Sequence, residues 1–229
     1  MSNKIFTFIF ARGGSKGIKN KNIVLINNKP LIYYSIKLGK KISGNNVYVS
    51  TDSEKIKKIS TQYGARIIPR PHSLAKDRSS ERDAWIHAIK YLQKKQIFFD
   101  IFLSLPTTSP LRNIIDIKKS IKLIKKCDFV FSGSKSKRSP WFNMVKKDKN
   151  NNIKILIEKN SKITTRQMSP KSYDLTTAAY VSRPNYILSN KNFFSGKALL
   201  NEIPEERALD IDTRYDLKIA RLLINGKNK

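Results

Sequence analysis

The chain has 229 residues, of which 39% are hydrophobic and 10% aromatic, a length and composition that suit one soluble globular domain. Cys127 is its one cysteine, which excludes an internal disulfide, and no stretch approaches the roughly 18 apolar residues of a membrane span. The 46 basic and 17 acidic residues give a formal net charge of +29. We therefore expect a single cytoplasmic domain, 1–229, without a membrane partner.

The net charge would ordinarily suggest a nucleic-acid partner. However, the basic residues are 34 lysines and 12 arginines, and the lysines are scattered in pairs such as Lys40-Lys41 and Lys94-Lys95. The sequence contains no arginine-rich tract, RNA-binding motif or zinc finger. These features favour a solvated lysine surface over a specific nucleic-acid site.

Short apolar runs alternate with segments whose apolar residues recur at helical spacing. The expected strands are residues 5–10, 47–51, 66–68, 99–105, 129–132 and 175–181. Helices are expected after residues 30, 53, 80, 113 and 213. This alternation indicates an α/β fold, with a mainly parallel, Rossmann-like sheet flanked by helices on both faces.

The first expected strand runs into a glycine-rich loop, Ala11–Asn22. Glycine permits positive φ and close approach of a ligand to the backbone, and successive N–H groups can form an anion-binding concavity. Arg12, Lys16 and Lys21 add positive charge. The glycine spacing fits neither a P-loop nor the dinucleotide-binding fingerprint. The loop therefore predicts a seat for a nucleoside triphosphate, with a glycine-rich surface turn as the alternative.

Polar residues follow the next strands. Asp52 comes after the strand 47–51, where open α/β sheets bind ligands, and it either contacts the ligand or supports the turn. Arg70 stands between two prolines that hold the backbone extended. Ser79 or Ser80 is expected to cap the following helix.

Two further segments interrupt the alternation. The loop Pro106–Arg112 holds hydroxyl side chains that could contact a base or a sugar. From about residue 133 to 176, residues 140–145 and 153–157 look like two strands around an Asn-rich turn. Such a hairpin cannot bury its apolar side alone, and a second subunit could cover it.

Asp210 and Asp212 lie on a segment expected to be extended, where residues i and i+2 point to the same side. Mg²⁺ favours one or two carboxylates together with phosphate oxygens and water. The alternative is that Asp212 caps the last helix and Asp210 is exposed to solvent.

Taken together, these motifs resemble the acylneuraminate cytidylyltransferases, the CMP-sialic acid synthetase family. The resemblance is carried by Ala11–Ile18 with Lys21-Asn22, by Ser79-Ser80 and by Asp210-Ile211-Asp212, and it runs from about residue 5 to 222. It implies the nucleotide-diphospho-sugar transferase type of fold, with a β insertion at about 133–176 that exchanges across a homodimer. Asn143 and the segment 175–181 resemble the legionaminate branch of the family.

The resemblance implies a Mg²⁺-dependent enzyme that transfers CMP from CTP to an acidic nine-carbon sugar and releases pyrophosphate. It implies phosphate contacts for Arg12 and Lys21, nucleotide and sugar contacts for Arg70, and metal binding by the two aspartates. The other implied contacts are Gly13, Gly14, Ser15, Asn22, Ser79 and Ser80. Two alternatives are a nucleotidyltransferase for another sugar or sugar phosphate and a basic nucleic-acid-binding protein.

Two positions differ from the family pattern. Arg166 matches the second arginine of an Arg-Arg-Gln stretch that reaches the acidic sugar or the triphosphate, but Thr165 replaces the first. Leu105 stands where many members have a substrate-binding glutamine, so Ser104 or Thr107 would have to take that role. The resemblance thus implies a catalytic set of Arg12, Lys21, Arg166 and Asp212.

Overall fold

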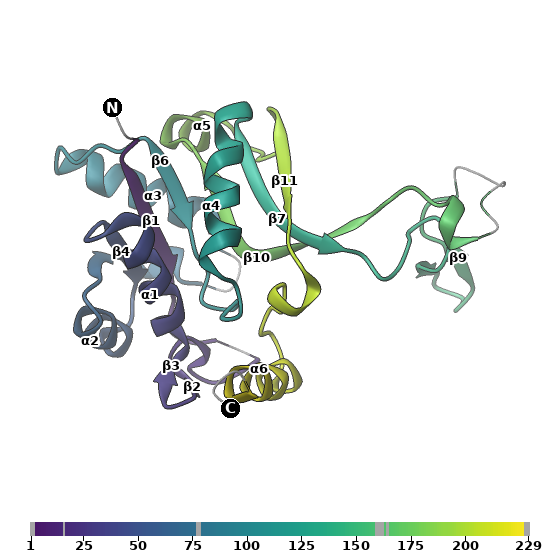
Figure 1. Cartoon of the computed structure of the whole chain (residues 1–229), viewed down its shortest axis with the longest axis horizontal. Coiled ribbons are helices and arrows are strands. Elements are labelled where there is room, and N and C mark those ends of the chain that lie inside the picture. The colour runs from purple at the N-terminus through teal and green to yellow at the C-terminus, as the bar shows by residue number, and fades with distance from the viewer. Residues whose placement is uncertain (1–2, 16, 77–78, 159–162, 164, 227–229) are drawn as a thin grey trace.

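The computed structural model describes residues 3–15, 17–76, 79–158, 163 and 165–226. A seven-stranded sheet forms its centre, in the order β11-β7-β10-β6-β1-β4-β5 (Figure 1). Only β10 runs antiparallel to its neighbours in this sheet, which confirms the mainly parallel, Rossmann-like prediction. The strands are β1 (Ile5–Phe10), β4 (Val47–Thr51), β5 (Arg66–Pro69), β6 (Ile101–Ser104), β7 (Phe129–Lys135), β10 (Tyr173–Ser182) and β11 (Ala198–Glu202).

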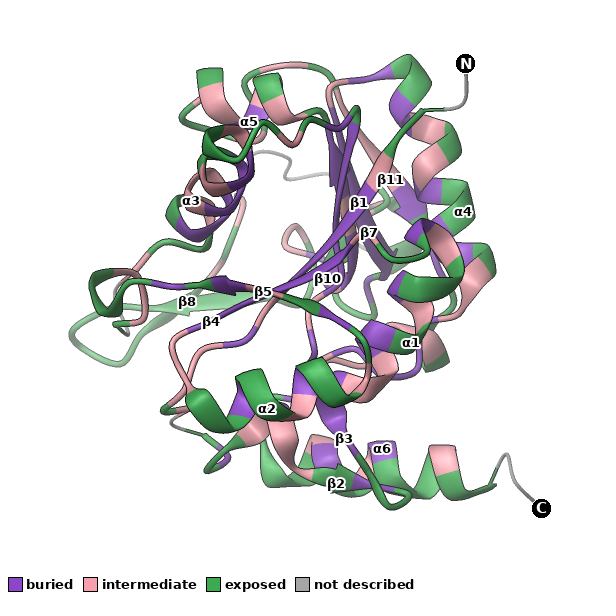
Figure 2. Ribbon diagram, turned by 90° about the vertical axis from the view of Figure 1, so that its left-hand side faces the viewer, coloured by how far each residue is buried: buried purple, intermediate pink, exposed green. Residues whose placement is uncertain are grey.

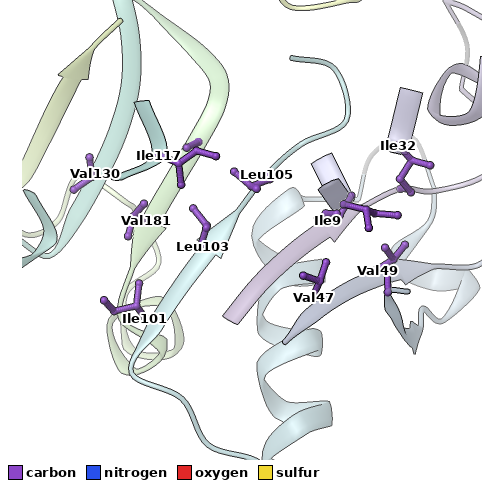
Figure 3. Close-up of a cluster of buried hydrophobic side chains, with 14 of the residues drawn as sticks. Ile9, Ile32, Val47, Val49, Ile101, Leu103, Leu105, Ile117, Val130 and Val181 are labelled. Atoms are coloured by element: carbon purple, nitrogen blue, oxygen red, sulfur yellow. The ribbon is translucent and has the colours of Figure 1, made fainter. Parts of the chain in front are cut away.

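Helices cover both faces of the sheet (Figure 2). The helices α1 (Leu31–Ser43), α2 (Glu54–Gln62) and α4 (Ile114–Leu123) pack on one face, and α3 (Glu81–Lys94) and α5 (Pro184–Ser189) on the other. Because successive strand residues point to opposite faces, Ile9 joins an aliphatic cluster (Figure 3) and Phe8 an aromatic one. Strands buried on both faces explain the nearly continuous apolar runs in the sequence.

A third, smaller cluster lies at the end of the sheet where the glycine-rich loop begins. There α6 (Arg214–Gly226) packs against the hairpin of β2 (Leu25–Ile26) and β3 (Lys29–Pro30). Short 3₁₀ helices are η1 (Lys21–Ile23), η2 (His72–Leu74), η3 (Ile124–Lys126), η4 (Arg166–Met168) and η5 (Glu205–Arg207). Within the described parts of the chain, no helix has the length and apolar character that crossing a membrane requires.

An arm extends away from the body beyond β7 and β10 (Figure 1). Its hairpin pairs β8 (Val145–Lys147) with β9 (Ile153–Ile155), so the predicted hairpin is confirmed. The predicted bounds of its first strand, 140–145, are wrong. Most of that segment is a turn, because the Ser139 carbonyl accepts the backbone N–H groups of Phe142, Asn143 and Met144.

Candidate active site

The glycine-rich loop after β1 is tied to the neighbouring strand β4. The Gly13 N–H donates to Asp52 Oδ1 at 2.9 Å, and Gly14 adopts a φ of +70°. Asp52 therefore supports the turn, one of the two roles that the sequence left open. A Cβ at Gly17 would lie 2.7 Å from the Asp212 carbonyl oxygen, so glycine there permits the close approach of the C-terminal segment.

Lys21 joins the two ends of the chain. Its Nζ lies 2.9 Å from Asp212 Oδ1 and donates to the Ile211 carbonyl at 2.8 Å. The Lys21 side chain is 17% exposed and that of Asp212 is 73% exposed, so the pair lies with its carboxylate open to solvent. The structure thus brings together the cation from the start of the chain and the acidic motif from its end.

Asn22 links the glycine-rich loop to the loop after β6. Its Nδ2 donates to the Arg12 carbonyl at 2.9 Å, and its Oδ1 accepts the Thr107 hydroxyl at 2.5 Å. Asn22 is largely buried, and its two contacts hold the glycine-rich loop against the loop after β6. The Thr107 hydroxyl donates its proton in this contact, and its oxygen keeps the capacity to accept a hydrogen bond from a ligand in the cavity that Thr107 lines.

The loop Pro106–Arg112 is rigid because a buried guanidinium crosses it. Arg112 donates to the Ala178 carbonyl at 2.7 Å and also to Pro106. Burial lowers the pKa of Arg112 to about 9, an effect that the nearby Asp210 opposes. The loop also holds the acidic segment, since the Thr108 carbonyl accepts the Ile211 N–H at 2.9 Å.

Two cavities flank Arg12, whose Nη1 donates to the Ala75 carbonyl at 3.1 Å. One, of about 420 Å³, lies beside Gly13, Gly14 and Asp52. The other, of about 350 Å³, is lined by Phe10, Arg12, Ser15, Gly17, Lys21, Asn22, Pro106, Thr107, Thr108 and Asp212. Glycine-loop backbone, two cations and a carboxylate therefore surround one space at the carboxyl edge of the sheet.

Asp210 and Asp212 sit in different surroundings. Asp210 Oδ1 is buried and has no hydrogen-bond partner among the described residues. Burial and, to a smaller extent, the charge of Asp212 raise the pKa of Asp210, while the hydroxyls of Thr108 and Thr177 oppose the shift. An unpartnered carboxylate oxygen next to a second carboxylate fits a hard divalent cation.

The alternative role for Asp212, capping α6, is wrong. Thr213 is the cap, since its Oγ1 accepts the Asp216 N–H at 3.2 Å and its own N–H donates to Asp216 Oδ2 at 2.7 Å. The predicted exposure of Asp210 in that alternative is also wrong, because its Oδ1 is buried. The Asp212 carboxylate therefore contacts Lys21 and does not cap α6.

Arg70, Ser79 and Ser80 are placed differently from the two loops. Arg70 is buried and donates to the Ser50 hydroxyl and carbonyl at 3.1 and 2.9 Å, and burial lowers its pKa to about 10. Ser79 donates to the Ser73 carbonyl at 3.0 Å, and Ser80 caps α3. None of the three is among the described residues that line the two cavities.

Arg166 lies in the arm, apart from Lys21. It is exposed, and its Nη2 donates to the Ser136 carbonyl at 3.1 Å. Together with Lys135, Arg138 and Lys171 it lines a separate cavity of about 470 Å³. Within one chain, therefore, the structure does not bring Arg166 to the predicted triphosphate seat.

The two residues that precede the loop Pro106–Arg112 are both buried. Leu105 is fully buried in the aliphatic core and cannot replace the family glutamine. The Ser104 Oγ is buried without a hydrogen-bond partner among the described residues. Lys16 lies outside the described residues. The sequence did not single out Thr177, which contacts the Thr108 and Ser109 hydroxyls at 2.9 and 2.7 Å. A short hydroxyl side chain far along the chain carries no pattern that would reveal this contact.

Comparisons with known proteins agree with this geometry. The family model described as "Cytidylyltransferase" matches residues 7–223. The chain is 34% identical to "Post-translational flagellin modification protein B" of Campylobacter coli, covering 99% of this chain and 97% of that protein. It is also 34% identical to "CMP-N,N'-diacetyllegionaminic acid synthase" of Campylobacter jejuni, covering 98% of this chain and 97% of that protein.

Solved structures share the fold at low sequence identity. A CMP:2-keto-3-deoxy-manno-octonic acid synthetase complexed with CTP superposes with a TM-score of 0.70 at 15% identity, covering 98% of this chain and 99% of that chain. A 4-diphosphocytidyl-2C-methyl-D-erythritol synthase gives 0.69 at 10% identity, covering 97% and 100%. These neighbours confirm the nucleotide-diphospho-sugar transferase type of fold. The chain, whose family match and curated relatives span nearly its whole length, belongs to the cytidylyltransferase family.

Proposed function

We propose that this protein transfers CMP from CTP to the anomeric hydroxyl of a sialic-acid-like nonulosonate, such as N-acetylneuraminate or legionaminate. The observation that carries this proposal is the contact of Lys21 with Asp212 beside a cavity that residues of the glycine-rich loop line. The name of the Campylobacter jejuni relative, a CMP-N,N'-diacetyllegionaminic acid synthase, supports the choice of sugar class.

The reaction joins two anions, so the site must neutralise charge and align the reactants. Lys21, Arg12 and N–H groups of the glycine-rich loop bind the triphosphate, while the Gly13 N–H stays with Asp52. The anomeric oxygen attacks the α-phosphorus and loses its proton, while the bond to the oxygen bridging the α- and β-phosphorus breaks and pyrophosphate leaves.

Asp210 and Asp212 are the residues that would hold Mg²⁺. The unpartnered Oδ1 of Asp210 and the open carboxylate of Asp212 fit the oxygen ligands that this ion prefers. When bound, Mg²⁺ polarises the α-phosphate and stabilises the departing pyrophosphate. Lys21, which bridges Asp212 and the Ile211 carbonyl, keeps the acidic segment against the glycine-rich loop.

We further propose a cytoplasmic homodimer formed through the arm. The arm exposes apolar side chains that its small hairpin cannot bury, among them Val145, Ile153 and Met168. The cavity at its base gathers Lys135, Arg138, Arg166 and Lys171. Four cations facing one space suit an acidic sugar, and exchange of arms would carry Arg166 to the partner's site.

A substrate panel tests the activity. Purified protein with CTP and Mg²⁺ is given N-acetylneuraminate, legionaminate, pseudaminate or 3-deoxy-octulosonate, and CMP-sugar and pyrophosphate are measured by chromatography. We expect equal amounts of both products with at least one nine-carbon acid. Folded protein that is silent with every acid, or that uses only a sugar 1-phosphate, would reject the proposal.

A further inference from the structure

A buried ion pair lies behind the segment that carries Asp210 and Asp212. The Arg207 guanidinium makes a bidentate contact with the Asp116 carboxylate, Nε to Oδ2 at 2.9 Å and Nη2 to Oδ1 at 3.0 Å. The Asp116 side chain is 3% exposed and that of Arg207 is 23% exposed. A paired contact of this kind fixes orientation as well as distance.

Asp116 is held from two other directions. Its Oδ2 accepts the Asn113 N–H at 3.0 Å in the capping box that starts α4, and its carbonyl accepts Asn201 Nδ2 from β11 at 2.8 Å. Because α4 begins directly after the loop Pro106–Arg112, Asp116 is rigidly joined to the loop that forms one wall of the cavity.

The acidic segment is held to the rest of the fold at three points. Arg207 holds its beginning through Asp116, the Thr108 carbonyl accepts the Ile211 N–H at 2.9 Å, and Lys21 contacts the Ile211 carbonyl and Asp212. Asp210 lies between the first two of these points. Loss of the first anchor would free residues 208–210 to move relative to Lys21.

We infer, on the basis of the proposed function, that Arg207 is a positioning residue that sets how strongly Asp210 and Asp212 bind Mg²⁺ beside the triphosphate. Arg207 is not among the described residues that line the cavity, and it acts through Asp116 and the backbone of its own segment. Residues that orient metal ligands from behind typically change metal affinity by roughly 10- to 100-fold when removed.

Calorimetry with a CTP analogue that has a methylene group between the α- and β-phosphorus tests this role without turnover. Its affinity is measured with Mg²⁺ and with EDTA, and the ratio gives the contribution of the metal. We expect Arg207→Met to reduce that ratio about 10-fold while the affinity in EDTA stays within about twofold. Arg207→Lys, which keeps the charge but not the bidentate contact, should recover part of the loss in this ratio.

Arg183→Met is the matched control. Arg183 also makes two contacts, to the Ile124 and Cys127 carbonyls at 3.0 Å each, but it follows the end of β10 at the opposite edge of the sheet. An unchanged metal ratio in Arg207→Met would overturn the inference. If Arg207→Met does not fold, Arg207→Lys decides: a ratio of affinities with Mg²⁺ and with EDTA within about twofold of wild type would then overturn the inference. Wild-type protein that binds no analogue would reject the proposed function itself.

Discussion

Lys21 Nζ lies 2.9 Å from Asp212 Oδ1, although 191 positions separate the two residues in the sequence. The contact joins the first loop of the sheet to the segment that precedes the last helix. Neither element could form the proposed triphosphate site alone, because one supplies cations and the other supplies carboxylates. Both ends of the chain must therefore come together to build it.

Replacing Lys21 should affect catalysis far more than stability. Lys21→Met removes the cation that we propose binds the triphosphate, and we expect kcat/KM for CTP to fall about 100-fold. Its exposed neighbour Lys19 is the control, and Lys19→Met should keep wild-type rates. Steady-state kinetics with thermal melts of both variants check this. Equal rates for the two variants would remove Lys21 from the mechanism.

Asp52 should act through the glycine-rich loop. Its Oδ1 accepts the Gly13 N–H at 2.9 Å, and Asp52→Ala should weaken CTP binding about 10-fold by loosening the loop. Asp100 makes the same type of contact, with the Lys4 N–H at 2.7 Å, at the other edge of the sheet. Calorimetric titration with CTP should show no loss for Asp100→Ala, and an equal loss in both variants would contradict the role of Asp52.

Asp210→Asn should gain stability while it loses activity. Burial raises the pKa of Asp210 above 3.8, so the folded protein binds this proton more tightly than the unfolded chain does. The ionised carboxylate therefore lowers stability as the pH rises through the raised pKa, and Asn removes this cost. The variant should be more stable than wild type at pH 7 in EDTA.

The pH dependence of that gain is the check. Chemical denaturation in EDTA should show the difference in unfolding free energy between Asp210→Asn and wild type shrinking as the pH falls through the raised pKa and then below 3.8, because the folded and the unfolded protein both bind the proton there. A difference that is constant with pH would mean that the carboxylate charge is not the cause. CMP transfer by the variant should be lost at every pH.

Arg166 should serve the partner's site if the arms exchange. Lys21→Met and Arg166→Met are each expected to lose most of their activity when assembled alone. A heterodimer of the two, isolated with two different affinity tags, would contain one site with an intact Lys21 and an intact Arg166. We expect about half of the wild-type activity per dimer. A heterodimer as inactive as its parents would show that Arg166 does not act across a subunit interface.

The sheet and its main helices followed from the sequence because their signals are local. Apolar runs such as residues 5–10 and 47–51 coincide with β1 and β4. The strand β11 and the helix α5 were missed. The segment Ala198–Glu202 contains two polar residues in five, so it has no clear apolar pattern. It becomes a strand by pairing with β7, which lies far from it in the sequence.

The site was predicted in part for the same reason. Glycine spacing and the Asp-x-Asp motif pointed to the loop and the acidic segment, which the structure brings into contact. The sequence does not reveal the contacts that position these groups, because Arg112 and Arg207 look like ordinary surface arginines in it. Their burial against carbonyl groups and against Asp116 arises only when loops far apart in the chain meet.

The most direct measurement is a crystal structure with the methylene-bridged CTP analogue and Mn²⁺ in place of Mg²⁺, with the metal located by its anomalous scattering. We expect the triphosphate on the glycine-rich loop within reach of Lys21, and an anomalous peak bound by Asp210 and Asp212. A triphosphate in the cavity at the base of the arm, or a metal bound away from both aspartates, would contradict the site described here.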